Sequence, residues 1–203
     1  VFDGRTERLD PYEFPRSRAV PPPRILSDEE LSRLLAAASQ DLPRHPLAGR
    51  TLHTVLGVLA STGLRSGEAL RLDRGDVDLE QAVLQIRQSK FHKDRLVPVH
   101  PSTCDALADY ARTRDAVFPR PECDGFFLGT RGRRLGTSAF GEGFRRARHR
   151  AGLDGGHPRH FRPHDLRHRF AVTRLAMWHR QGIDVQARLH LLATYLGHGR
   201  YAD

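Results

Sequence analysis

Two short segments of this sequence, residues 83–88 (VLQIRQ) and 95–100 (RLVPVH), are typical of β-strands. The residues SKFHKD between them are expected to form the connection of a β-hairpin. The other patterned segments have helical periodicity, and the sequence contains no internal repeat. The expected fold is therefore mainly α with a small antiparallel β-sheet, an α+β protein.

Start and stop signals divide the helical part. Ser27 and Glu30 have the spacing of a capping box, so the folded domain and its first helix are expected to begin there. The apolar segment 51–62 is expected to be a helix that Gly63 ends in the left-handed conformation. A short helix is expected to follow at residues 64–72.

More helices are expected in the second half of the chain. Ser102 is expected to cap a helix over residues 102–113, and a basic helix is expected around residues 145–150. The next helix has a face made of Leu166, Phe170, Thr173 and Met177. The last helix is expected to end at Gly197.

Residues 1–26 are rich in Pro and Arg and lack periodicity, so they are expected to form an arm or interdomain linker. Residues 27–203 are expected to form the folded domain. Because the sequence begins at Val1 without Met and ends abruptly at Asp203, we expect it to be a piece of a longer protein.

The charge predicts a polyanionic partner. The chain has 33 Lys and Arg against 24 Asp and Glu, a net charge of +9 and a pI of about 10.6. Nucleic acid or an acidic membrane surface would fit, although an arginine-rich genome would also raise the pI. Cys104 and Cys123 are too few for a disulfide framework, and no segment is typical of a signal peptide or membrane span. A cytoplasmic location is expected.

Two arginines, two histidines and a lysine on separate elements form the candidate site: Arg65, Lys90, His164, Arg167 and His198. Each has an ordinary explanation alone, such as an ion pair of Arg65 with Glu68 or a solvated Arg167. Together they suit a phosphodiester whose P–O bond is exchanged, because two guanidiniums can clamp its non-bridging oxygens and stabilise the transition state. Such a site needs no metal cofactor.

A metal pair is the competing interpretation, since His164 and His168 are four residues apart on a helix. Arg167 between them would bring a positive charge to the cation, which disfavours this interpretation.

Lys90 and Lys93 are the only lysines in the chain, which otherwise uses arginine. A leaving 5′ oxygen needs a proton, and arginine does not give one up in proteins, whereas lysine can. Lys90 is therefore a candidate general acid. A chance pair of lysines in a solvated turn is the alternative.

Four segments in this order resemble the motifs of the tyrosine recombinases, the phage-integrase family: TGLRSGEAL (62–70), SKFHKDRLVPV (89–99), PHDLRHRFA (163–171) and YLGH (195–198). The resemblance runs from about residue 27 to the end and implies the tyrosine-recombinase catalytic-domain fold. It implies a catalytic set of Arg65, Lys90, His164, Arg167 and His198. Glu68 matches a supporting acidic position.

The resemblance also implies a reaction. A tyrosine attacks the scissile phosphate of double-stranded DNA and forms a 3′-phosphotyrosyl intermediate, which a 5′-hydroxyl later resolves without ATP. His164 would act as general base and Lys90 as general acid, while the arginines and His198 would hold the phosphate. The full-length protein would act as a homo-oligomer, a tetramer on synapsed DNA, with no membrane partner and with a location at the nucleoid.

The sequence departs from the family where the nucleophile should be. The family's tyrosine lies roughly nine residues beyond the position of His198, whereas Tyr201 comes too early. The chain as given is therefore expected to bind DNA without cleaving it.

Six arginines are expected to contact the DNA backbone without reading its sequence: Arg131, Arg133, Arg134, Arg145, Arg146 and Arg148. A solvated charged face is the alternative for each.

The favoured function is a site-specific recombinase or integrase of a mobile element. Two alternatives stay open: a DNA-binding regulator on a recombinase scaffold, and a type IB topoisomerase that relaxes supercoils. A pure binder has no use for a lysine at position 90, which argues against the regulator.

Overall fold

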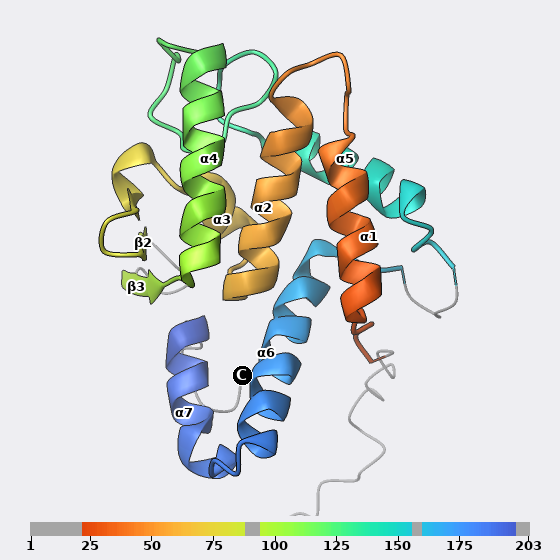
Figure 1. Ribbon diagram of the computed structural model, residues 1–203, viewed down its shortest axis with the longest axis vertical. Coiled ribbons are helices and arrows are strands. Elements are labelled where there is room, and N and C mark those ends of the chain that lie inside the picture. Colours follow the sequence, from red (N-terminus) through yellow and green to blue (C-terminus); the bar gives the residue numbers. More distant parts are fainter. Residues whose placement is uncertain (1–21, 88–93, 156–159, 198–203) are drawn as a thin grey trace, which may run out of the picture.

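The computed structural model describes residues 22–87, 94–155 and 160–197. Within these residues the chain forms seven α-helices, a 3-10 helix and three short strands (Figure 1). In chain order they are α1 (Asp28–Ser39), α2 (Ala48–Thr62), α3 (Ser66–Arg71), η1 (Arg74–Asp76), β1 (Val77–Asp78), β2 (Val83–Ile86), β3 (Arg95–Pro98), α4 (Pro101–Val117), α5 (Thr137–Arg150), α6 (Pro163–Arg180) and α7 (Val185–Leu196). The mainly α fold with a small antiparallel sheet is confirmed.

The body of the molecule is built around α2, which lies between α1 and α4 in Figure 1. This helix is apolar on most of its circumference, and Val55, Leu56 and Leu59 are almost fully buried. A helix of this kind must be covered on all sides. Side chains from α1, α4, α5, the sheet and the start of α6 complete one core around it.

The start of α1 follows the predicted capping box. The Ser27 hydroxyl accepts the Glu30 backbone N–H at 3.2 Å, and the Glu30 carboxylate accepts the Ser27 N–H at 3.0 Å. These bonds satisfy two donors that a helix start leaves free.

The β-hairpin is also confirmed. Strand β2 pairs antiparallel with β3, Leu84 opposite Val97, and both side chains are buried. The two-residue strand β1 adds to the other edge of β2, within a segment that sequence patterns predict only as turns. The hairpin connection with Lys90 and Lys93 lies outside the described residues.

Two local predictions are wrong. Helix α4 is capped by His100 rather than Ser102: its ring nitrogen accepts the Ser102 N–H, because Pro101 is already suited to the first helical position. Thr173 is exposed instead of lying on the buried face of α6. The buried face shifts along this helix, since its first half packs on the body and its second half on α7.

Helices α6 and α7 form an antiparallel pair that extends away from the body (Figure 1). A separate small cluster of Phe170, Leu192 and Leu196 joins them. Helix α7 ends at Gly197 (φ 72°), and α2 ends at Gly63 (φ 66°), both left-handed as predicted. Among the described helices, none combines the length and the hydropathy that crossing a bilayer requires.

Candidate functional site

The site begins where α2 ends. Gly63 turns the chain sharply, so that Arg65 becomes the N-cap of α3. A Cβ atom at Gly63 would lie 2.6 Å from Cδ1 of Phe170. Glycine is therefore required here both for the left-handed backbone and for the close approach of α6.

Arg65 is held by a buried carboxylate. Glu68 accepts the backbone N–H of Arg65 at 2.9 Å and its guanidinium at 3.0 Å. Arg95 from β3 donates two further bonds to the same carboxylate, at 3.1 and 2.9 Å. Burial alone would raise the pKa of Glu68, but these donors outweigh burial and hold the pKa below its usual value. Glu68 is therefore ionised at neutral pH.

Arg167 joins two helix ends. Its guanidinium donates to the carbonyl oxygen of Gly63 at 2.9 Å and to that of Leu196 at 2.7 Å. The C-terminal ends of helices carry partial negative charge, so they suit a buried cation. The alternative explanation of a solvated Arg167 is wrong, because this side chain is 4% exposed. Burial, and next the charge of Arg65, lower its pKa to about 10, which leaves it protonated at neutral pH.

The C-terminal end of α7 brings Arg65 and Arg167 together. Nη2 of Arg65 lies 3.5 Å from the carbonyl oxygen of Gly197, a long contact next to the Leu196 carbonyl that Arg167 binds. Both guanidiniums thus reach the last carbonyls of α7, and Arg65 remains partly exposed. The partly exposed Arg65 can bind an anion such as a phosphate, and the buried Arg167 adds positive charge next to it.

His164 lies in the first turn of α6, three residues before Arg167. Its ring packs edge-on against the ring of His168, with centroids 4.9 Å apart. His164 is exposed at the surface, yet partial desolvation of its ring, and then the positive potential of His168 and Arg167, lower its pKa. A neutral imidazole at physiological pH can accept a proton. Within the described parts of the chain, no group of three His, Cys, Asp or Glu side chains is arranged for a metal ion.

Arg65 and Arg167 thus meet at the end of α7, and His164 lies one turn before Arg167 on α6. Lys90 and His198 lie outside the described residues. The family model described as "Phage integrase family" matches residues 24–202. The chain belongs to the phage integrase family.

Individual relatives agree with this assignment. A putative integrase/recombinase, y4rE, of Sinorhizobium fredii is 57% identical over the whole chain, which covers 65% of that protein. The crystal structure of XerA recombinase matches 89% of the chain with a TM-score of 0.69 and 30% identity, and the chain covers 58% of it. The chain thus spans less than two thirds of either relative.

A further structure shows the same fold. XerH site-specific recombinase, solved as a pre-cleavage complex with its difH substrate, matches 92% of the chain with a TM-score of 0.68 and 22% identity. The chain covers 50% of that protein.

Arg95 is the site residue of this integrase-family chain that sequence reasoning missed. Side chains alternate along a strand, so Arg95 shares a face with Val97, which is fully buried. An arginine on the buried face of a strand needs a partner. The alternation of buried and exposed positions along β3 is therefore the sequence signal that could have identified Arg95.

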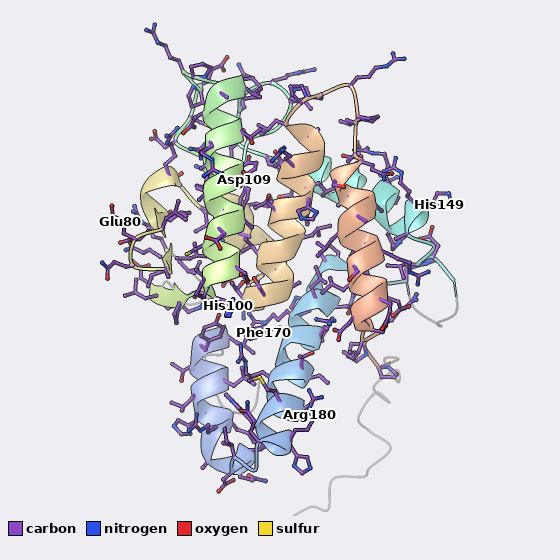
Figure 2. All side chains as sticks on the ribbon, in the orientation of Figure 1. Glu80, His100, Asp109, His149, Phe170 and Arg180 are labelled. Carbon is purple, nitrogen blue, oxygen red and sulfur yellow. The ribbon has the colours of Figure 1, made fainter. Side chains whose placement is uncertain are left out.

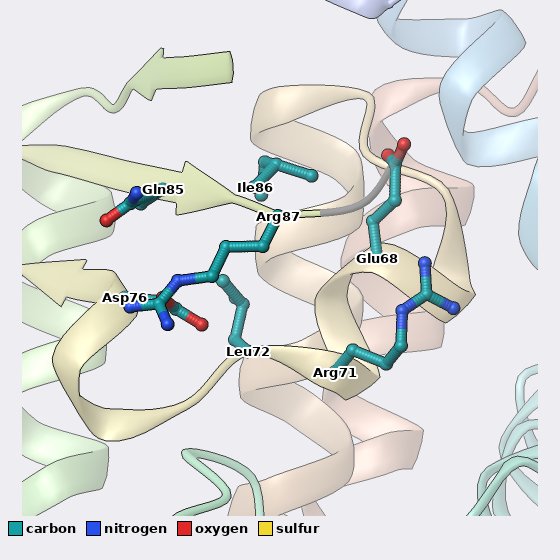
Figure 3. A pocket seen from close by; sticks show the side chains of 7 residues that line it. All are labelled: Glu68, Arg71, Leu72, Asp76, Gln85, Ile86 and Arg87. Carbon is teal, nitrogen blue, oxygen red and sulfur yellow. The ribbon is translucent and has the colours of Figure 1, made fainter. Parts of the chain in front are cut away.

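A pocket of about 170 Å³ adjoins Glu68 between α3 and β2 (Figure 3). Arg71 and Arg87 are exposed at its edge. The Arg87 side chain extends across to the buried Asp76, with Nε 2.6 Å from Oδ1. The pocket is therefore lined by two arginines and two carboxylates, Glu68 and Asp76.

The six arginines expected at the DNA backbone have different surroundings. Arg131, Arg133 and Arg145 are exposed, and Arg133 pairs with Glu122 at 2.6 Å. Arg134 donates to the last carbonyls of α3 and pairs with Asp73.

The other two support the fold with their guanidiniums. Arg146 pairs with the buried Asp41 at 2.7 Å. Arg148 binds Asp154 at 2.5 Å and the carbonyl oxygen of Phe161 at 3.1 Å. The prediction of DNA contacts stays a prediction for all six, and the exposed members are the ones with side chains available to a phosphate.

Proposed function

We propose that this chain is the catalytic domain of a site-specific DNA recombinase or integrase of a mobile element. It would cut and rejoin DNA strands through a 3′-phosphotyrosyl intermediate without metal or ATP. The observation that carries this proposal is the meeting of Arg65 and Arg167 at the end of α7, with His164 one turn before Arg167 on α6.

The residues divide the chemistry between them. Arg65 and Arg167 bind the non-bridging oxygens of the scissile phosphate and stabilise the charge of the pentacoordinate transition state. Neutral His164 accepts the proton of the attacking tyrosine hydroxyl. Lys90 protonates the departing 5′ oxygen, and His198 adds a hydrogen bond to the phosphate.

The domain organisation is part of the proposal. Residues 1–26 form an arm and residues 27–203 the catalytic domain. The capping box at Ser27 supports a start of the helical domain there, and Leu26 just before it already packs into the same core.

The proposed partners are double-stranded DNA and further copies of the full-length protein in a tetramer. The net charge of +9 favours a polyanion. The complex of XerH with its difH substrate is a precedent for a DNA partner on this fold.

The test uses the full-length protein and a library of random-sequence DNA duplexes. The wild type is expected to form covalent adducts, stable in denaturant, with a subset of the duplexes. The duplexes recovered in this way serve as substrates for the rate measurements. Arg167→Lys should lower the single-turnover rate of adduct formation by roughly 10²- to 10³-fold, the cost of losing one preorganised donor. Lysine keeps the charge but cannot bind two carbonyls and a phosphate.

Arg180→Lys is the matched control, because Arg180 is exposed at the other end of the same helix. It should react at the wild-type rate. A wild-type protein that binds the duplexes but forms no adduct would establish the regulator instead. Adducts that relax supercoiled plasmid without forming junctions between duplexes would identify a topoisomerase.

A further inference from the structure

We propose that Arg95 is a positioning residue for the reaction proposed above, on which this inference rests. From β3, Arg95 fixes the Glu68 carboxylate and the end of α7 relative to each other. It thereby sets the orientation of Arg65 and the position of Gly197, the last described residue before His198.

The first half of this role is the contact with Glu68. Nη1 and Nη2 of Arg95 donate to the two carboxylate oxygens, at 3.1 and 2.9 Å, in a bidentate pair. The same two oxygens accept the guanidinium and the backbone N–H of Arg65. The Glu68 side chain is 2% exposed, so the loss of a donor to this carboxylate is costly. A shift of Arg95 would therefore move Arg65 through the shared carboxylate.

The second half is the contact with α7. Nε of Arg95 donates to the carbonyl oxygen of Tyr195 at 3.1 Å. A Cβ atom at Gly197 would lie 2.8 Å from Nη1 of Arg95, so the left-handed glycine passes directly against the guanidinium. The residue after Gly197 is His198. Arg95 thus determines where the chain leaves α7.

Only arginine can make this set of contacts. Its guanidinium offers Nε and both Nη atoms in one rigid plane, whereas the ammonium of lysine is a single point of charge. Arg95 is 13% exposed, and both of its Nη atoms are bonded to Glu68. Its Nε is bonded as well, to the carbonyl oxygen of Tyr195, so in this proposal its role is to place these groups.

The experiment is a double-mutant cycle in the full-length protein, with a duplex that the wild type retains covalently. Arg95→Lys should leave duplex binding within about twofold and lower the single-turnover cleavage rate roughly 10- to 100-fold, the usual cost of small misplacements. In an Arg65→Lys background, where the positioned group is already lost, the same change should cost less than about threefold.

Arg74→Lys is the matched control. Arg74 also forms a bidentate pair, with Asp115 at 3.0 and 3.0 Å, away from Arg65. It should cleave within about twofold of wild type. If Arg95→Lys does not fold, Arg95→Gln replaces it in the cycle, because it breaks the bidentate pair while leaving the direct bonds of Glu68 to Arg65 in place.

The outcomes separate the two proposals. Wild-type protein that forms no adduct removes the proposed function. If the wild type cleaves and Arg95→Lys cleaves equally fast, only the positioning role is overturned. The same holds if the double mutant loses rate by the product of the two single-mutant factors, because Arg95 then does not act through Arg65. The positioning role is supported if Arg95→Lys slows cleavage in the wild-type background but hardly at all in the Arg65→Lys background, with duplex binding unchanged in both.

Discussion

The body of the molecule and its α6–α7 pair are held in different ways. The body encloses a continuous apolar core that reaches from α1 to the first turns of α6. Beyond that point α6 and α7 share only a small cluster around Phe170. Figure 2 shows Phe170 at the junction with the body and Arg180 near the far end of α6. Apolar burial therefore fixes the body strongly and the helical pair weakly.

Hydrogen bonds from arginines connect the two regions. Arg95 and Arg167 donate to backbone carbonyls at the end of α7, from β3 and from the first half of α6. The candidate site lies where these bonds cross from the body to α7. Its geometry thus depends on polar contacts between arginines and helix ends, whereas the fold depends on the core.

Truncation of a core leucine gives the largest expected contrast between the regions. Leu56→Ala in the body should cost about 3–5 kcal/mol in the free energy of unfolding, because Leu56 is fully buried in the centre of α2. Leu192→Ala in the small cluster should cost about 2 kcal/mol, because this cluster has few neighbours with which to lose contact. Urea denaturation at neutral pH measures both.

Hydrogen exchange sharpens this comparison. Leu192→Ala should speed exchange of the α7 amides more than that of α2, since the lost contacts lie on α7. Equal costs for the two leucines would mean that α6 and α7 belong to the same cooperative unit as the body.

The second prediction concerns the two glycines Gly63 and Gly182, which have nearly equal left-handed angles, φ 66° and 69°. A Cβ at Gly63 would meet Phe170 at 2.6 Å, whereas one at Gly182 would meet nothing within 4 Å. Gly182→Ala should cost about 1 kcal/mol for the backbone alone. Gly63→Ala should cost about 2–4 kcal/mol, because overpacking adds to the same backbone term.

Thermal unfolding of the two variants gives the difference directly. The backbone cost is the same in both variants and cancels in the difference between their free energies of unfolding. The remaining difference measures how tightly α6 is packed against the end of α2. Equal melting temperatures would show that Phe170 can move aside at no cost, and the junction would then be loose.

Local signals predicted most of the body. The capping box at Ser27, the helix stops at Gly63 and Gly197 and the hairpin strands all depend on a few neighbouring residues, and each is present. Strand β1 was missed because two residues carry too little pattern. The face of α6 was misplaced at Thr173 because its partner changes from the body to α7 along the helix.

For Arg65 and Arg167 the sequence singled out the residues but not their contacts. Motif order identified Arg65 and Arg167, yet the burial of Arg167 between two helix ends depends on how α2 and α7 meet in space. Arg95 was missed because its partners, Glu68 and Tyr195, are distant in sequence. Such contacts follow from tertiary packing, which a local pattern does not contain.

The smallest expected effect is a shift in the pH dependence of cleavage. It tests the candidate site, where polar contacts and not the apolar core set the geometry. Partial desolvation and the positive charge of His168 and Arg167 lower the pKa of His164. The base must be neutral, so cleavage by the full-length protein should keep its rate as pH falls through about 6.5, the ordinary histidine value. The rate should then fall about tenfold per pH unit below the lowered pKa.

His168→Gln removes one of the groups that disfavour protonation of His164, so it should raise the pKa of His164 and move the acid limb to higher pH. His190→Gln, an exposed position on α7, should leave the limb in place. Single-turnover cleavage rates between about pH 5 and 8 measure the limb. If His168→Gln leaves it unmoved, the group that titrates is not His164, and the general base must lie elsewhere than at the start of α6.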